Sequence, residues 1–465
     1  MESYIDGILN EKIKKIKEEK NVYDFGTVIK VNDYIIEVTG LDNVTFYERI
    51  NIENKAYGYV SLIQKSSVII SILKEENKIF VGDRAYLTGE EIKTYISKEA
   101  IGRVIDIFGV DLLSNKKFDH LTKLKIESKQ IPIIDRTSVN RPLYTGIAGI
   151  DLIYPIGKGQ RQLIIGDKKT GKTQIALDTI VNQKDKDVIC IYTAIGKTKK
   201  DIKNIYNELL KRGAMNYTII IAATNDEKTP VLSLTPYASL SIANMYLKSG
   251  FDVLVILDDL SRHAKAYREL SLLSGKTPGR DAYPSDIFYT HSRLLEKGCQ
   301  HKNGGSITIL PIVETKADDI TDYISTNIIS ITDGQIVMSS KNFQKGEKPA
   351  INYQLSVSRL GGNVQTDSIK KLGAVVRREL LSYLEVREVY EMANIDDMSP
   401  SLRNKMINGE KLLDKLVQYK YSPRSEDEII KTFSNIENDT KEENINHEDK
   451  IENNIEPKED DKNED

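Results

Sequence analysis

The chain has 465 residues, of which 40% are hydrophobic and 29% are charged, and its formal net charge is −3 at pH 7. This length allows several domains with buried cores. No segment approaches the roughly 18 consecutive apolar residues of a membrane span. The chain has two cysteines and five scattered histidines, which indicate neither a disulfide framework nor a metal cluster. A cytoplasmic protein without a secretory signal is expected.

Residues 1–21 carry Ile5, Leu9, Ile13 and Ile16 at helical spacing and predict an amphipathic helix. Such a helix packs either on its own domain or on a partner. In residues 22–96 the pattern changes to short β-type runs, such as GTVIKV, YIIEVTG and SVIISIL, which Gly and Asp separate. Closely spaced short strands predict a small β-barrel.

Residues 97–364 predict a nucleotide-binding α/β domain that begins with a connector at 97–135. Apolar strands such as QLIIG, DVICIYTAI, DVLVILDD and SITILPIV alternate with helical segments at 172–184 and 198–212. This alternation indicates a mostly parallel sheet with helices on both faces. Residues 365–435 predict a C-terminal α-helical domain, so the fold class is multi-domain.

The last segment, residues 436–465, predicts a disordered acidic tail, because its low hydrophobicity cannot offset the entropy of ordering. From Glu437 to Asp465 thirteen residues are acidic and four are basic, which gives −9 here and +6 for the rest of the chain. A positive charge this small and dispersed suits a phosphate ligand and does not indicate nucleic-acid binding.

A phosphate-binding loop is predicted between the strand QLIIG and the helix that follows it. The loop consists of Gly166, Asp167, Lys168, Lys169, Thr170, Gly171, Lys172 and Thr173. Its glycines let backbone N–H groups surround the phosphates of ATP or ADP, and the helix N-terminus adds its positive dipole end. We expect Lys172 to contact the β and γ phosphates and Thr173 to bind Mg²⁺.

A second strand, DVLVILDD, ends in the paired carboxylates Asp258 and Asp259. An acid after four apolar residues is the Walker B pattern, which places a carboxylate near the phosphate-bound magnesium. Asp258 is the predicted metal ligand.

Hydrolysis also needs a residue that orients or deprotonates the attacking water. In multimeric P-loop ATPases this carboxylate follows the strand after the P-loop helix. Here DVICIYTAI is followed by Gly196, Lys197 and further basic residues, and Asp201 already belongs to the next helix. Lys197 is able to bind a γ-phosphate but not to act as a base. Unless a distant Glu supplies this function, the site holds ATP without turning it over.

Several segments resemble the alpha subunits of F-type rotary ATP synthases. They are GIAGIDLIYPIGKGQRQLIIGDKKTGKTQIALDTI, PGRDAYPSDIFYTHSRLLE and KPAINYQLSVSRLGG. The resemblance is dense from about 130 to 375 and looser over the barrel. It implies a barrel, a RecA-like P-loop domain and a helical domain. It also implies an alternating hexamer with catalytic beta-type subunits, central-stalk and peripheral-stalk partners, and membrane contact only through the complex, at the cytoplasmic face.

The same resemblance implies roles for particular residues. In that family the alpha site binds Mg-ATP without turnover while the complex couples ATP synthesis or hydrolysis to proton transport. The Arg of the SVSR segment, here Arg359, reaches the neighbouring catalytic site as an arginine finger. The adenine end of the pocket corresponds to Lys348, Pro349, Gln418 and Lys420.

The chain also departs from the family pattern. Lys169, Lys197 and Lys316 stand where the family usually has Gln, Lys348 replaces an Arg, and Lys420 replaces a Gln. Extra cations near phosphates are expected to tighten anion binding and to disturb magnesium geometry. The resemblance ends near residue 435, where family members continue through further helices, so a truncated helical domain is expected.

Other functions stay open at this point. One is an alpha-like subunit of a divergent F-type-like ATPase that performs mechanical or other transport work. A hexameric RNA translocase would need its own catalytic acid and an aromatic RNA-binding barrel, and neither is evident in the sequence. A free-standing ATP sensor would bind ATP without a beta-type partner.

Overall fold

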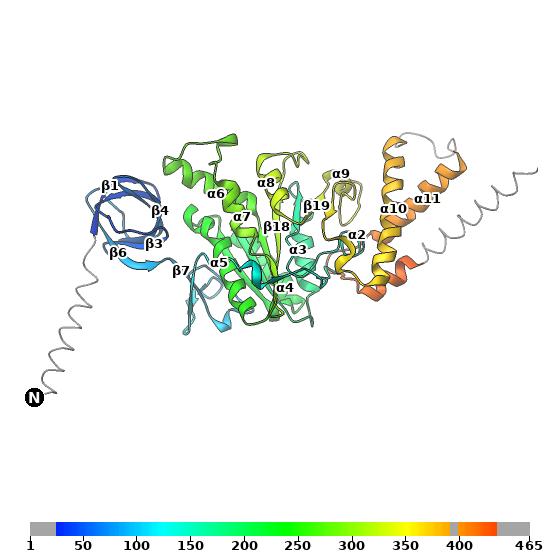
Figure 1. The fold of residues 1–465 in the computed structure, drawn as a ribbon, viewed down its shortest axis with the longest axis horizontal. Helices are drawn as coiled ribbons and strands as arrows, with labels where there is room; N and C mark the ends of the chain where they lie inside the picture. The colour runs from blue at the N-terminus through cyan, green and yellow to red at the C-terminus, as the bar shows by residue number, and fades with distance from the viewer. Residues whose placement is uncertain (1–24, 391–398, 435–465) are drawn as a thin grey trace, which may run out of the picture.

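The computed structural model describes residues 25–390 and 399–434. The helix predicted for 1–21 and the tail predicted for 436–465 lie outside these described residues. Figure 1 shows a barrel, a central α/β body and a helical region arranged in a row, which confirms the predicted multi-domain architecture.

The first body is a closed barrel with the strand order β1-β2-β5-β4-β3-β6. Its strands are β1 (Phe25–Asn32), β2 (Ile35–Thr39), β3 (Glu48–Ile52), β4 (Ala56–Ile63), β5 (Val68–Glu75) and β6 (Arg84–Glu91). Buried and less buried residues alternate along β3, as expected when one face of a strand fills a core. Closure pairs β1 with β6, so neither of these strands is left as an open edge.

The segment between the barrel and the P-loop contains short strands and turns. Strand β7 (Lys93–Ile96) leaves the barrel and pairs antiparallel with β11 (Thr122–Lys125). Strands β8 (Val104–Ile105), β9 (Val110–Asp111) and β10 (Lys116–Lys117) extend one edge of the central sheet. Strand β12 (Arg136–Thr137) pairs with β17 (Cys299–His301) beside that sheet. The predicted connector is therefore partly built into the central body.

The central sheet has the order β10-β9-β8-β15-β14-β16-β18-β13-β19-β20, and its strands from β8 to β19 run parallel. The inner strands are β13 (Leu163–Gly166), β14 (Val188–Lys197), β15 (Thr218–Thr224), β16 (Asp252–Asp258), β18 (Ser306–Glu314) and β19 (Gly334–Met338). Strand β20 (Val357–Ser358) closes the other edge antiparallel to β19.

Helices cover both faces of this sheet. On β16, Leu254 and Ile256 belong to the core shared with α2 (Ala148–Ile153), α3 (Lys172–Val181) and α4 (Lys199–Lys211). Val253, Val255 and Leu257 belong to the opposite core, which includes α5 (Thr229–Lys248), α6 (Leu260–Leu273), α7 (Ile287–Leu295) and α8 (Tyr323–Ile331). Successive strand residues point to opposite faces, which explains why an unbroken apolar run is needed here.

The third body is helical. Helix α9 (Ser340–Gln344) precedes it, α10 (Asp367–Val389) packs on α11 (Pro400–Leu416) and on α2, and residues 426–434 are again helical. The core under α3 and α4 also includes apolar residues of this helical body, namely Ile369, Leu372, Leu412, Leu416 and Phe433. Among the described helices, none combines the length and apolar character of a membrane span.

Candidate functional site

The site lies at one edge of the parallel sheet, where the carboxyl ends of several strands meet. Gly166 ends β13, Lys197 ends β14, Asp258 ends β16 and Glu314 ends β18. These strands lie together in the sheet, because β16 pairs with both β14 and β18, and β18 pairs with β13. Residues that are far apart in sequence therefore reach one edge.

The predicted phosphate-binding loop connects β13 to α3. Gly171 caps the helix with a φ of 100°, a left-handed conformation that glycine adopts without strain. Within the loop, Thr170 donates a hydrogen bond to the Asp167 carbonyl at 2.8 Å. The Asp167 carboxylate accepts from the Thr315 hydroxyl at 2.6 Å and from the Asp318 N–H at 3.0 Å. The loop is thus fixed to the segment after β18, and its helix N-terminus is suited to anions.

Three lysines of this loop have different surroundings. The Lys172 side chain is buried, and its ammonium donates to the Asp167 carbonyl at 2.5 Å. Burial lowers the pKa of Lys172, and the nearby carboxylates of Glu314, Asp259 and Asp258 oppose this shift. Lys168 is exposed and pairs with Glu314 at 3.3 Å, and Lys169 is exposed.

Asp258 is the centre of the polar contacts at this edge. One carboxylate oxygen, Oδ2, accepts hydrogen bonds from the Thr173 hydroxyl at 2.8 Å and the Tyr192 hydroxyl at 2.5 Å. The other, Oδ1, lies 3.0 Å from the Lys197 ammonium. Burial and the Asp258 charge raise the pKa of Tyr192 well above its ordinary value, so Tyr192 is a hydrogen-bond donor here.

The structure brings into contact Thr173 and Asp258, the two residues predicted from the sequence as magnesium ligands. A hydroxyl and a carboxylate in contact supply the hard oxygen donors that Mg²⁺ prefers, so this pair fits a magnesium ion. The sequence did not reveal that Tyr192 and Lys197 share the same carboxylate. The only signal for Tyr192 is a hydroxyl within the apolar strand VICIYTAI.

The second carboxylate of the strand has a structural role. Asp259 caps α6 by accepting a hydrogen bond from the Arg262 N–H at 2.7 Å, and it lies 3.5 Å from the Arg262 guanidinium. Burial, followed by the charge of Asp258, raises the pKa of Asp259 to about 6. Capping satisfies a helix N–H that would otherwise lack a partner.

Other carboxylates near the site have partners of their own. Asp201 is the first acid after β14, and it exchanges hydrogen bonds with Thr198 across the first turn of α4. Glu314 pairs with Lys168. The position directly after Gly196 is occupied by Lys197, which has no proton-accepting role while it is charged.

The residues predicted for the adenine end lie around the start of α2 and the end of α11. The Gln418 side chain donates to the carbonyls of Gly146 at 2.6 Å and Ser422 at 2.7 Å, and accepts from the Ala148 N–H at 3.1 Å. Its backbone N–H donates to the Lys348 carbonyl at 2.7 Å. Gln418 thus joins Lys348, α2 and the turn after α11, while Lys420 is exposed.

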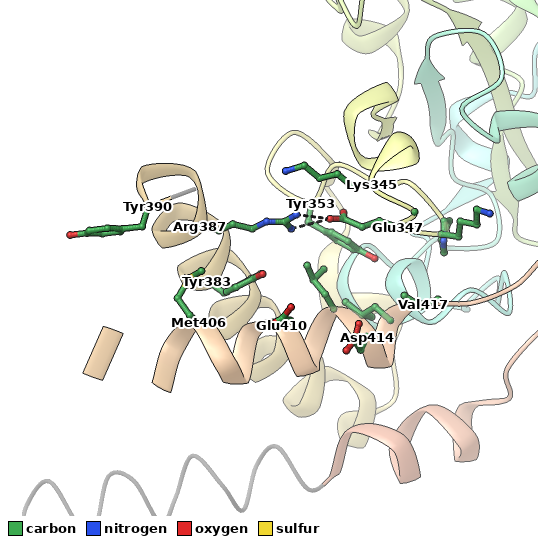
Figure 2. Close-up of a pocket in the computed structure, with 15 residues that line it drawn as sticks. Lys345, Glu347, Tyr353, Tyr383, Arg387, Tyr390, Met406, Glu410, Asp414 and Val417 are labelled. Carbon is green, nitrogen blue, oxygen red and sulfur yellow. Dashed lines mark hydrogen bonds and ion pairs between the residues drawn. The ribbon is translucent and has the colours of Figure 1, made fainter. Parts of the chain in front are cut away.

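A cavity of about 560 Å³ borders this end, and Lys348, Pro349 and Val417 line one side of it. Figure 2 shows Tyr383 and Arg387 of α10 and Met406 and Glu410 of α11 around it. Arg387 pairs with Glu347 at 2.9 Å across the cavity wall. The cavity therefore separates the loop after α9 from the two long helices.

Arg359 lies apart from all of these residues. It follows edge strand β20, and its backbone N–H donates to the Asp333 carbonyl at 2.9 Å. Its guanidinium is exposed and lies 3.5 Å from the Ile329 carbonyl. Within the described residues no carboxylate pairs with it. The structure thus presents this cation at the surface and not at the chain's own phosphate-binding loop.

The sheet and the loop define a P-loop nucleotide-binding protein. Comparison with known proteins narrows this class. The family described as ATP synthase alpha/beta family, nucleotide-binding domain, matches residues 146–358. Proteins named ATP synthase subunit alpha from two Clostridium botulinum strains, Alaska E43 and Eklund 17B, are 43% identical over 422 residues, which is 90% of this chain and 83% of theirs. The protein of that name from Clostridium acetobutylicum is 42% identical over the same length. The chain therefore belongs to the family of F-type ATP synthase alpha subunits.

Proposed function

We propose that this chain is the non-catalytic, regulatory nucleotide-binding subunit of an F-type rotary ATP synthase or ATPase. It holds ATP or ADP with Mg²⁺ at residues 166–173 and lends Arg359 to the catalytic site of an adjacent beta-type subunit. The partners are beta-type subunits in an alternating hexamer and the central and peripheral stalks. Through that complex the chain serves ATP synthesis or hydrolysis coupled to proton transport, at the cytoplasmic face of the membrane.

One observation carries the non-catalytic part of this proposal. Lys197 is the last residue of β14, directly after Gly196, and its ammonium pairs with Asp258. A water molecule that attacks the γ-phosphate needs a group that accepts or orients its proton. Asp201 and Glu314 have other partners. The arrangement supports retention of nucleotide and not its turnover.

The loop residues have separate roles in this proposal. Backbone N–H groups of the loop and Lys172 bind the phosphates, and Thr173 and Asp258 hold magnesium, which neutralises phosphate charge when it is bound. Gln418 and Pro349 border the adenine. Lys172 and Thr173 begin α3, Asp258 ends β16, and Gln418 follows α11, where its hydrogen bonds to Gly146 and Lys348 fix it.

The purified full-length chain tests the proposal. We expect it to bind about one ATP per chain in equilibrium dialysis and to release negligible phosphate over many minutes, because the residue after Gly196 is a lysine and not a carboxylate. Lys172→Ala should abolish binding, since the ammonium that faces the phosphates is removed. Steady-state phosphate release by the pure chain, lost in Lys172→Ala, would contradict the non-catalytic assignment.

A further inference from the structure

Lys197 reaches Asp258 because β14 is irregular at its end. The pairing with β15 runs from Cys190 to Ile195 in register and then skips one residue, so that Lys197 pairs with Thr224. The skipped residue, Gly196, has a φ of 63°, and its carbonyl accepts a hydrogen bond from Arg262. A bulge of this kind changes the direction of the next side chain. Here it directs Lys197 toward the end of β16.

The result is a nearly buried ion pair. The side chain of Asp258 is 3% exposed and that of Lys197 is 15% exposed, and their charged atoms lie 3.0 Å apart. The other oxygen of Asp258 already accepts from Thr173 and Tyr192. A buried carboxylate is strongly destabilising unless a cation compensates it. In this chain the compensating cation is part of the protein.

We propose that Lys197 is a built-in counter-ion that competes with Mg²⁺ for Asp258, so that the site retains nucleotide with little dependence on magnesium. This inference rests on the proposed nucleotide-binding function of the same loop. The ammonium lies on Oδ1, whereas the Thr173 hydroxyl contacts Oδ2. The two oxygens share one negative charge, so a carboxylate that the ammonium already neutralises attracts magnesium less strongly. Magnesium bound to nucleotide therefore displaces an existing favourable interaction at this carboxylate.

A neutral side chain at position 197 changes this competition. Without the ammonium, Asp258 stays buried and uncompensated until a metal ion arrives, which increases the gain in free energy when magnesium binds. Binding of magnesium and binding of nucleotide are then coupled more strongly, and by linkage each raises the affinity for the other by the same factor. The measurable quantity is the ratio of nucleotide affinity with magnesium to that without it.

This proposal differs from a contact between Lys197 and the γ-phosphate, which the sequence alone suggested. A γ-phosphate contact affects ATP and not ADP, whereas competition at Asp258 affects both nucleotides. ADP is therefore the sharper probe. The control is Lys199→Gln, because Lys199 is 75% exposed, lies two residues away and pairs with Asp226 and not with Asp258.

The experiment measures ADP and ATP affinity of the full-length chain by calorimetry, in excess MgCl₂ and in EDTA. For the wild type and Lys199→Gln we expect magnesium to raise ADP affinity by less than about fivefold, the lower limit of typical coupling. For Lys197→Gln the increase should be at least about tenfold larger. Lys197→Arg, which keeps the positive charge beside Asp258, should show a smaller magnesium effect than Lys197→Gln.

Two outcomes overturn the inference while the proposed function stands. One is an equal magnesium effect on ADP affinity in the wild type and Lys197→Gln. The other is an increase in the ADP affinity of the wild type above about a hundredfold on addition of magnesium, toward the upper limit of typical coupling. This result overturns the inference even if Lys197→Gln fails to fold. Absence of nucleotide binding by the folded wild type in both buffers overturns the proposed function as well.

Discussion

His263 of α6 and His291 of α7 lie side by side in the core behind the Walker B strand. Both are fully buried, with His263 Nδ1 and His291 Nε2 3.4 Å apart, and His263 Nε2 lies 3.2 Å from the Ser233 carbonyl. Burial lowers the pKa of His263 to about 4, and burial together with His263 lowers the pKa of His291 well below its ordinary value. The pair is therefore neutral at physiological pH.

These histidines make stability depend on pH. Below about pH 6.5 the unfolded chain binds protons that the folded core excludes, so stability is lost as pH falls from about 6.5 toward 4. His263→Gln removes one such group and should reduce the loss between pH 7 and pH 5 by up to about 2 kcal/mol. Urea unfolding of the wild type and the variant at pH 7 and at pH 5 measures this loss of stability. The exposed His120→Gln should leave the pH dependence unchanged; an unchanged dependence in His263→Gln would argue against the buried neutral pair.

Carboxylates whose pKa is raised in the folded chain change its stability in the opposite direction as pH falls. A comparison of the wild type with a variant is therefore needed. Burial raises the pKa of Asp106, Asp151 and Asp259 to about 6 in each case. Between about pH 6 and 4 the folded chain binds these protons before the unfolded chain does, so these groups gain stability as pH falls. Only the difference between wild type and His263→Gln isolates the histidine contribution.

Single residues also show what the sequence could and could not predict. The phosphate-binding loop was predictable because its glycines, Lys172 and Thr173 are contiguous and their spacing has a mechanical reason. Thr173 and Asp258 were each predicted to bind magnesium, and their direct contact is seen only in the structure. From the sequence, Lys197 was expected to be able to bind a γ-phosphate, and its pairing with Asp258 was not foreseen. No local pattern reveals a skipped residue at Gly196, so this contact needed the structure.

At the scale of elements, the hairpin of α10 and α11 depends on a close approach at Gly409. A Cβ added at this residue would overlap the ring and Cβ of Tyr383, which is itself buried. The sequence predicted that residues 365–435 are helical. It did not predict which residue lets them approach, because a glycine in a helix reads only as a weak helix former.

Gly409→Ala separates these two effects. Helix propensity alone predicts a gain of roughly 0.5–1 kcal/mol, whereas overpacking against Tyr383 predicts a loss of about 1–3 kcal/mol. We expect the loss to prevail and the melting temperature to fall. Lys411→Ala, at an exposed position of the same helix, should change it little. A higher melting temperature for Gly409→Ala would show that the two helices separate at little cost.

The boundary of the barrel is a second case at this scale. The sequence placed residues 22–96 in the barrel, and its six strands end with β6 at Glu91. Strand β7 continues the same apolar alternation but pairs with β11, about 30 residues later in the chain. Strand patterns predict that a segment is extended, and they do not identify its partner.

At the scale of the whole molecule, the nucleotide loop and Arg359 face different surroundings. The loop and Asp258 belong to inner strands of the sheet, whereas Arg359 follows β20, the last strand in the sheet order. The backbone at Arg359 is anchored, since β20 pairs with β19 and the Ser358 hydroxyl donates to the Pro155 carbonyl at 2.8 Å. A fixed backbone with an exposed guanidinium suits a residue that acts on a neighbouring chain.

Arg359→Ala tests this action in trans. The variant should keep its own ATP affinity and still assemble with a beta-type partner, because the side chain has no carboxylate partner among the described residues. Turnover of the assembled complex should fall by roughly 10³–10⁵-fold, the usual contribution of an arginine finger, since the lost charge acts mainly in the transition state. Lysine should restore little activity, because an ammonium lacks the planar fork that meets two phosphoryl oxygens together.

The measurement is ATP hydrolysis per mole of intact complex, with assembly followed by gel filtration. Arg378→Ala is the control, because Arg378 is 67% exposed and pairs with its neighbour Glu379 on α10. A purely structural role for Arg359 predicts weakened assembly with a near-normal rate for each complex that forms. A role in the neighbouring catalytic site predicts normal assembly with a rate lowered by orders of magnitude. Near-normal turnover in a fully assembled Arg359→Ala complex would therefore end the arginine-finger assignment, whatever its effect on stability.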